Sequence, residues 1–187
     1  MKTKLKHSEA ELVSKAKAGD SSAFRQLVLR HELQVRTTVI GMLGDTAEAE
    51  DVAQEVFIRF FRALKSFRGE AGLATYLTRI AINLSLNEVK RRQRKNRILS
   101  PFSFGKGEQQ IDIEDSAADP SRLDTKELVH KALLKLEPDF RSVIVLRMLD
   151  GYSVKETAEI LQLPQGTIAS RLARAQKKLK EILSKLL

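Results

Sequence analysis

Helical periodicity runs through most of this chain and is interrupted at only a few places. Four prolines and nine glycines occur in 187 residues, and apolar residues recur every three or four positions over long segments. In the first half, the breaks fall near residues 19–20, 41–45 and 66–72. At the second break, Asp45 followed by Glu48 predicts a capping box that starts a new helix. The pattern therefore predicts an all-α fold.

A change of character divides the chain into two helical parts. Pro101 and Gly105 interrupt the periodicity, and acids without an apolar stripe follow them. We therefore expect two small helical domains, residues 8–97 and 122–187, joined by a flexible acidic linker, residues 98–121. The second domain, of about 65 residues, is small for an independent core.

The charge balance favours a polyanionic partner. Lys and Arg number 33 against 24 Asp and Glu, which gives a formal net charge of +9. For a basic protein of this kind, nucleic acid is the first partner to consider. No apolar run approaches the roughly 20 residues that span a bilayer, and no secretory signal is present, so we expect a cytoplasmic protein without membrane insertion.

Features of an enzyme active site are absent from the sequence. The chain has no cysteine, which excludes a disulfide scaffold, a thiolate zinc site and a cysteine nucleophile. Its three histidines are scattered, no His/acid cluster has metal-ligand spacing, and no glycine-rich phosphate-binding loop occurs. We therefore expect a protein that is not an enzyme and that needs no cofactor or metal.

The helix predicted over residues 48–65 has one apolar side and one charged side. Two apolar residues, Ile58 and Phe61, nevertheless fall within or beside the charged side. A solvated surface with a Glu55–Arg59 ion pair explains the charges alone. Apolar side chains flanked by acids instead indicate a protein-binding patch for a basic partner surface. The members of this acidic–apolar patch are Asp51, Gln54, Glu55, Ile58 and Phe61.

A narrow polar strip runs between two apolar sides of the helix predicted over residues 73–97. Tyrosine can stack on a base, asparagine can bond a base edge, and lysine or arginine can hold phosphates. Six positive charges over residues 90–97 continue the strip, although a solvated basic tail explains many such runs. In the preceding break, we expect Phe67 to hold an unstacked base. The candidate single-strand contacts are Phe67, Arg68, Gly69, Tyr76, Arg79, Asn83, Asn87, Lys90, Arg91 and Arg94.

A helix-turn-helix is predicted near the C-terminus. Ser153 and Glu156 form a capping box that starts a short helix, and residues 162–166 make a tight turn. The longer second helix has the pattern of a recognition helix that enters the major groove, with an ordinary basic helical hairpin as the alternative. An arginine there can bond guanine, whereas Thr167 and Lys178 are expected to hold phosphates. The outward-facing residues are Thr167, Ser170, Arg171, Arg174, Lys177 and Lys178.

These motifs together resemble a known family. Residues 45–97, with Asp-Val-Ala-Gln-Glu-Val-Phe at 51–57 and Tyr-Leu-Thr-Arg-Ile-Ala-Ile-Asn at 76–83, resemble conserved region 2 of bacterial sigma factors. Residues 133–183, with Gly-Thr-Ile-Ala-Ser-Arg-Leu-Ala-Arg-Ala at 166–175, resemble region 4. Two such regions without room for a third domain resemble the extracytoplasmic-function (ECF) group of the sigma-70 family.

The resemblance implies an alternative sigma factor that binds core RNA polymerase and directs promoter-specific transcription initiation. Positions that bind the clamp coiled coil of the largest polymerase subunit are matched by Asp51, Gln54 and Phe61. The part that captures a flipped base of the −10 element is matched by residues 67–72 and Asn83. Residues that read the −35 element as duplex promoter DNA are matched by Ser170, Arg171 and Arg174. Many members of this group are held by an anti-sigma factor, so we expect such a partner.

Three positions depart from the family's usual pattern. Tyr76 stands where the family usually has tryptophan, Ala169 where the residue is often basic, and Ala173 where some members place an aromatic ring. The family's promoter preferences are therefore not carried over. The alternative function is a stand-alone helix-turn-helix regulator, which needs only duplex DNA and leaves residues 45–97 unexplained.

Overall fold

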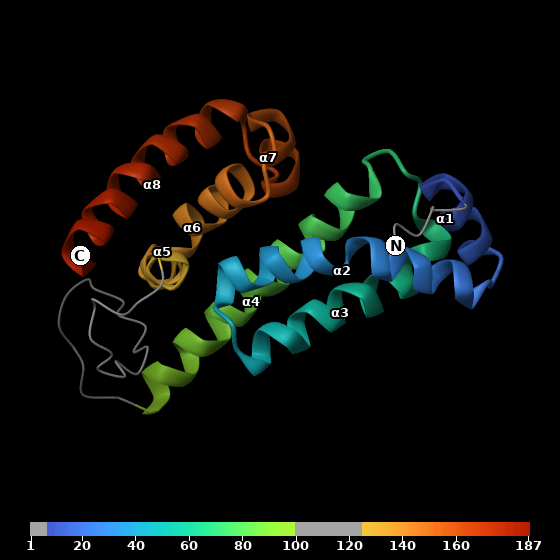
Figure 1. Cartoon of the computed structure of the whole chain (residues 1–187), viewed down its shortest axis with the longest axis horizontal. Helices are drawn as coiled ribbons and strands as arrows, with labels where there is room; N and C mark the ends of the chain where they lie inside the picture. The colour runs from blue at the N-terminus through green and yellow to red at the C-terminus, as the bar shows by residue number, and fades with distance from the viewer. Residues whose placement is uncertain (1–6, 100–124) are drawn as a thin grey trace.

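The computed structural model describes residues 7–99 and 125–187, in which every regular element is a helix (Figure 1). The N-terminal unit comprises α1 (Glu9–Lys17), α2 (Ser21–Leu43), α3 (Ala47–Ala63), the 3-10 turn η1 (Leu64–Ser66) and α4 (Leu73–Leu99). The C-terminal unit comprises α5 (Thr125–Leu134), α6 (Pro138–Ile144), the π-helical turn η3 (Val145–Leu149), α7 (Val154–Leu161) and α8 (Gln165–Leu186). The predicted all-α fold is confirmed.

The predicted acidic linker lies almost wholly outside the described residues. Its first two residues, 98 and 99, continue α4, so this helix ends two residues beyond the predicted boundary. Among the described helices, none combines the length and the hydropathy needed to cross a bilayer.

Short polar side chains start the helices of the N-terminal unit. Ser8 opens α1 with a capping box, and the carboxylate of Asp20 accepts hydrogen bonds from the first turn of α2. At α3 the structure differs from the prediction by one residue, because Thr46 and not Asp45 is the N-cap. The extended backbone of Thr46 (φ −134°, ψ 160°) lets its hydroxyl accept a hydrogen bond from the amide of Ala49, so the helix begins one residue later.

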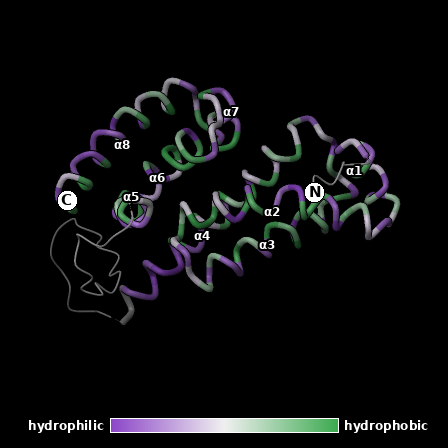
Figure 2. The backbone as a smooth tube through the Cα atoms, viewed as in Figure 1, coloured by the Kyte–Doolittle hydropathy of each residue, from purple (hydrophilic) through white to green (hydrophobic). Residues whose placement is uncertain are grey.

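The N-terminal unit is a helical bundle around one apolar core. Apolar and polar stretches alternate along its helices, as amphipathic packing requires (Figure 2). The apolar side predicted for α3 is confirmed, since Val56 and Phe60 are buried. The Phe60 ring contacts the rings of Phe24, Phe67 and Tyr76, so aromatic packing joins α2, α3 and α4.

The C-terminal unit contains the predicted helix-turn-helix. The capping box of Ser153 and Glu156 starts α7, which confirms this part of the prediction. The chain turns at Gln162, whose backbone is left-handed (φ 54°, ψ 45°), and α8 begins at Gln165. Small Ala158 is buried against α8, where the two helices approach each other.

The two units pack against each other through a continuous apolar core. Val145, Leu146, Tyr152 and Ile160 of the C-terminal unit belong to the same buried cluster as the core of α1–α4. Gly41 of α2 permits this approach, since a Cβ atom there would lie 3.0 Å from a methyl carbon of Val145. An interface this apolar resembles the interior of a domain more than a transient domain contact.

Polar side chains also join the two units. The hydroxyl of Tyr152 lies 2.8 Å from the hydroxyl of Thr78 and accepts a hydrogen bond from the amide of Gln34. The carboxylate of Asp150 lies 2.8 Å from the hydroxyl of Thr38. Burial raises the pKa of Asp150 to about 6, although the hydrogen bond with Thr38 opposes this shift.

A buried arginine closes the end of α2. Arg141 of α6 is 1% exposed, and its guanidinium donates to the backbone carbonyls of Met42, Leu134 and Leu136. Met42 belongs to the other unit, so Arg141 satisfies a carbonyl that the C-terminus of α2 leaves open. Burial lowers the pKa of Arg141 to about 10. This value is still well above 7, so the guanidinium remains charged at neutral pH.

Candidate nucleic-acid interface

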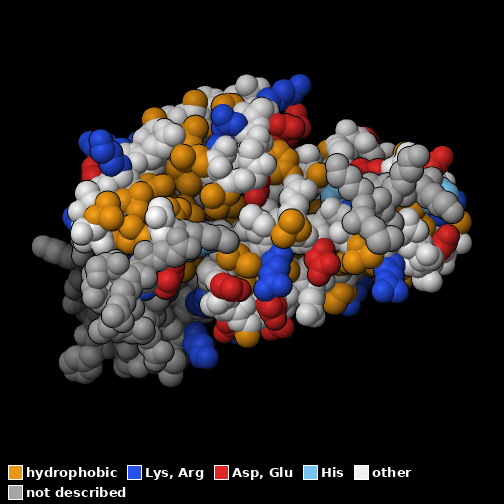
Figure 3. Space-filling model, viewed as in Figure 1, with side chains coloured by type: hydrophobic (Ala, Val, Ile, Leu, Met, Phe, Trp, Pro, Cys, Tyr) orange, Lys and Arg blue, Asp and Glu red, His pale blue; other side chains and the backbone are white. Residues whose placement is uncertain are grey.

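The acidic–apolar patch lies on the outer face of α3. Ile58 and Phe61 are 43% and 60% exposed. Figure 3 shows acidic, basic and apolar side chains side by side over the region of α3. The Glu55–Arg59 ion pair is also present, with 2.9 Å between carboxylate and guanidinium, so the acid is partly neutralised within the helix. The other exposed members of the patch are Asp51 and Gln54.

Phe67 lies in a different place from the one expected. Its ring is buried, with the centroids of Phe60 and Tyr76 at 5.8 and 4.9 Å. A base cannot stack on a ring enclosed in this way, so we assign Phe67 to the core. Its neighbours Arg68 and Gly69 are exposed, and Gly69 has a left-handed backbone (φ +74°).

The polar strip on α4 is exposed along its C-terminal part, which Figure 2 shows as strongly hydrophilic. Nearer the start of the helix, Tyr76 and Arg79 are only half-exposed. The guanidinium of Arg79 donates to the backbone carbonyl of Glu159 in α7 at 3.1 Å, so the C-terminal unit contacts this end of the strip. The exposed strip residues are Asn83, Asn87, Lys90 and Arg94.

The basic run at the end of α4 contains structural as well as exposed arginines. Arg91 bonds the carboxylate of Glu88 at 2.7 Å, which holds the pKa of Glu88 below its usual range and raises the pKa of Arg91. Arg92, which the sequence reasoning did not single out, donates to the Leu43 carbonyl and the Thr46 hydroxyl. It therefore ties α4 to the end of α2 and the start of α3. In the sequence, the feature that could have indicated this role is Glu88, which lies four residues before Arg92 and can form an ion pair with it.

The predicted DNA contacts of the recognition helix α8 lie between residues 167 and 178, in its N-terminal two thirds. Three of them contact the first turn of α6: Arg171 pairs with Asp139 at 3.3 Å, and Arg174 and Lys178 lie over the ring of Phe140 at 5.9 and 4.9 Å. The half-exposed members of the set are Thr167, Arg171 and Lys178. The exposed members are Ser170, Arg174 and Lys177.

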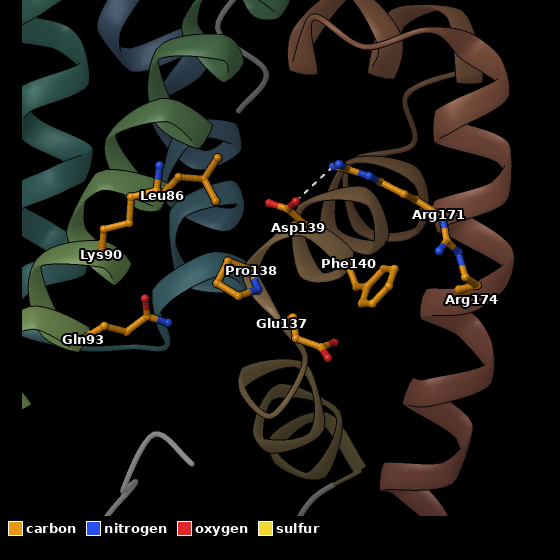
Figure 4. Close-up of a pocket in the computed structure, with 9 residues that line it drawn as sticks. All are labelled: Leu86, Lys90, Gln93, Glu137, Pro138, Asp139, Phe140, Arg171 and Arg174. Atoms are coloured by element: carbon orange, nitrogen blue, oxygen red, sulfur yellow. Dashed lines mark ion pairs between the residues drawn. The ribbon is translucent and has the colours of Figure 1, made fainter. Parts of the chain in front are cut away.

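Residues from both candidate DNA-binding surfaces line one groove. A cavity of about 480 Å³ lies between α4, α6 and α8, and Figure 4 shows its lining. Lys90 comes from α4, whereas Arg171 and Arg174 come from α8. The groove is therefore basic on two sides, with Asp139 of α6 paired to Arg171 between them.

Two sigma-factor family models match this chain. The model described as Sigma-70 region 2 matches residues 27–95, which include the acidic–apolar patch and the strip on α4. The model described as Sigma-70, region 4 matches residues 126–179, which include the predicted contacts of α8. The two matches lie in the two helical units, in the order that the sequence predicts.

The chain is also similar to individual sigma factors. It is 34% identical over 184 residues to the RNA polymerase sigma-H factor of Pseudomonas aeruginosa, with 96% of this chain and 95% of that protein covered. It is 33% identical over 174 residues to the ECF RNA polymerase sigma-E factor of Escherichia coli K12, with 88% of each covered.

Solved structures agree with these similarities. The sigma factor RpoE from Bartonella quintana, in complex with the anti-sigma factor NepR, matches with 30% identity and a TM-score of 0.62, over 86% of this chain and 96% of that one. CnrH, in complex with the cytosolic domain of CnrY, matches with 25% identity and a TM-score of 0.68, over 95% and 97%. This chain therefore belongs to the extracytoplasmic-function group of the sigma-70 family and is an alternative sigma factor of RNA polymerase.

Proposed function

We propose that this sigma factor binds core RNA polymerase through the acidic–apolar patch and contacts promoter DNA through α4 and α8. The observation that carries the proposal is the exposure of Ile58 and Phe61 beside acids, in a chain that also has a recognition helix. A stand-alone helix-turn-helix regulator needs only the second feature. The partner surface is basic, as we expect of the clamp coiled coil of the largest subunit, and the protein acts by binding rather than by catalysis.

Gel filtration with purified core RNA polymerase tests the patch. We expect the wild type to co-elute with core polymerase, and the Asp51→Ala/Gln54→Ala/Phe61→Ala variant to elute separately. A Glu181→Ala/Lys185→Ala variant changes exposed charges near the end of α8 and should still co-elute. If the wild type ignores core polymerase yet binds duplex DNA alone, the stand-alone regulator is the better explanation.

The exposed part of the strip on α4 is proposed to contact melted −10 bases. The Asn83 amide can bond a base edge, and Lys90 and Arg94 can hold phosphates. The buried ring of Phe67 supports this surface by packing against Tyr76 instead of stacking on a base.

Open-complex formation tests the role of Asn83. Asn83→Ala should impair strand opening more than duplex binding by α8, because unstacked bases are exposed only after melting. Asn96→Ala is the matched control, since Asn96 is also exposed on α4 but is not one of the candidate single-strand contacts. Equal losses in both assays would refute the assignment.

The N-terminal half of α8 is proposed to read the −35 element in the major groove. Arg174 is exposed there and can bond guanine with its planar fork. Arg174→Ala should relax the −35 preference by about 1–3 kcal/mol. A uniform loss across all sequences would make Arg174 a phosphate contact instead, and Lys180→Ala, further along α8, serves as the control.

Separation of α4 and α8 is proposed to accompany promoter binding. A major groove is about 12 Å wide and encloses a recognition helix from both sides. Arg171 and Arg174 line one cavity with Lys90 of α4, so a duplex placed on α8 would occupy this cavity. The chain has no cysteine, so a Gly41→Cys/Val145→Cys pair can link the two units. The oxidised variant should lose −35 binding and the reduced variant should regain it. Equal binding by both forms would contradict this step.

We also propose that an anti-sigma factor holds this chain. The support is its similarity to RpoE from Bartonella quintana, which was solved with NepR. Tagged protein purified from its native host should carry a regulator that competes with core polymerase for binding. Recovery of polymerase subunits alone under every growth condition would oppose the proposal.

A further inference from the structure

The N-cap residue and the first turn of α6 contact the recognition helix through two acids and a ring. The Asp139 carboxylate lies 3.3 Å from the guanidinium of Arg171, and Glu137 forms an ion pair with Lys178. The Phe140 ring lies under the same lysine, 4.9 Å from its ammonium nitrogen. All these residues belong to the C-terminal unit, and Glu137, Phe140 and Arg171 also line the groove that faces α4.

Asp139 lies in the first turn of α6, where an acid stabilises the helix dipole, but that role does not require Arg171 as a partner. The Asp139 side chain is 66% exposed, and an ion pair this exposed adds little to the stability of a fold. A carboxylate beside a DNA-binding helix also repels phosphates and so lowers affinity for any DNA. The side chain of Arg171, in contrast, is only 25% exposed, and it lines the groove between α4, α6 and α8.

Orientation of the arginine is the remaining effect of this contact. A guanidinium has five N–H donors in one plane, so the Asp139 carboxylate, 3.3 Å from one terminal nitrogen of Arg171, attracts that nitrogen and leaves the other donors for a base. A side chain ordered before binding loses less conformational entropy when it meets its base. This saving in entropy is obtained only when a base presents its acceptors to the ordered guanidinium, so it increases discrimination between bases.

We propose that Asp139 is a positioning residue for −35 recognition, which holds Arg171 in the orientation that reads one base pair. Glu137 acts on a different kind of contact, because Lys178 is a flexible point charge suited to phosphates. It restrains overall affinity without selecting a base. The inference rests on the proposed reading of the −35 element by α8.

Holoenzymes assembled with each variant can be compared on promoter duplexes that carry every single base-pair change in the −35 element. Arg171→Ala first identifies the position that Arg171 reads. At that position, Asp139→Asn should lower discrimination by about five- to tenfold, and should raise affinity for mismatched DNA by about two- to fivefold. Glu137→Gln should raise affinity by a similar factor at every position. Asp139→Glu should restore part of the discrimination.

The double variant separates positioning from a simple charge effect. If Asp139 acts through Arg171, Asp139→Asn should cause no further loss of discrimination when Arg171→Ala is already present. If Asp139→Asn changes the affinity by the same factor for base-pair changes at every −35 position, the inference is overturned, while the proposed reading of the −35 element by α8 still stands. If Arg171→Ala alters no base preference at all, the proposed role of Arg171 and the inference fail together. Co-elution of each variant with core polymerase checks that it is folded.

Discussion

Asp150 couples the packing of the two units to pH. The Thr38 hydroxyl lies 2.8 Å from the Asp150 carboxylate and 3.0 Å from the carbonyl oxygen of Gln34. A hydroxyl has one proton, so it cannot donate fully to both oxygens. A protonated Asp150 can donate to Thr38, which then donates to Gln34, and both contacts are satisfied. Burial of the charge is the larger effect, so the packed arrangement favours the protonated acid although the hydrogen bond with Thr38 opposes the shift.

The size of this effect follows from the pKa values. Burial raises the pKa of Asp150 to about 6 in the packed arrangement, against 3.8 for an exposed aspartate. Because the pKa is raised, packing gains stability as the pH falls through 6 and loses it as the pH rises. Between pH 7 and pH 5 the balance should shift toward packing by about tenfold, or roughly 1.3 kcal/mol, and the gain should level off below about pH 4. The neighbouring Tyr152 stays neutral in this range, since burial raises its pKa further.

Fluorescence energy transfer between two introduced cysteines measures the packing. The chain has none of its own, and Arg25→Cys on α2 with Lys180→Cys on α8 labels exposed sites in the two units. At a urea concentration at which molecules with packed units and molecules with separated units are both present, the packed fraction of the wild type should increase as the pH is lowered from 8 to 5. Asp150→Asn donates to Thr38 at every pH, so it should remain packed and lose this dependence. Every other titratable group is the same in both proteins, so an equal pH dependence in both would refute the assignment to Asp150.

Three further substitutions test contacts within and between the units. Gly41→Leu should lower the packed fraction, because even a Cβ atom there lies 3.0 Å from Val145, whereas Gly166→Ala faces open space and should not. Arg92→Ala should cost about 1–3 kcal/mol in urea unfolding, since it removes bonds to the ends of α2 and α3; a change within error would contradict that role. Arg141→Ala should cost about 2–4 kcal/mol by the same assay, because buried carbonyls lose their donor, and a neutral effect would show that water replaces it.

Local chemistry made the helices predictable. The capping box at Ser153 and Glu156 depends on residues three positions apart, so the sequence alone contains the whole motif. Asp45 and Thr46 are both good N-cap residues, and only the backbone conformation at Thr46 decides between them. The exposure of Ile58 and Phe61 was also predictable, since the other face of the same helix is more apolar and turns to the core.

Contacts between distant elements were not predictable in this way. The burial of Phe67 depends on rings from α3 and α4 that surround it. The structural role of Arg92 depends on carbonyl and hydroxyl groups nearly fifty residues earlier, and inside a basic run it is indistinguishable from a DNA contact. The acids that pair with Arg171 and Lys178 precede α8 by more than twenty residues, outside any helical spacing rule.

The small size of the C-terminal unit explains why the two units share a core. A unit of about 60 residues buries too little apolar surface to be strongly stable alone. Val145, Leu146 and Tyr152 accordingly pack into the N-terminal core. Separation of the units would return these side chains to water at a cost of about 25 cal/mol per Å² of apolar surface. If the units separate on promoter binding, contacts with polymerase must offset that cost. The free chain should therefore bind promoter DNA more weakly than the holoenzyme. A variant with weakened packing, such as Gly41→Leu, should reduce this difference in affinity between the free chain and the holoenzyme.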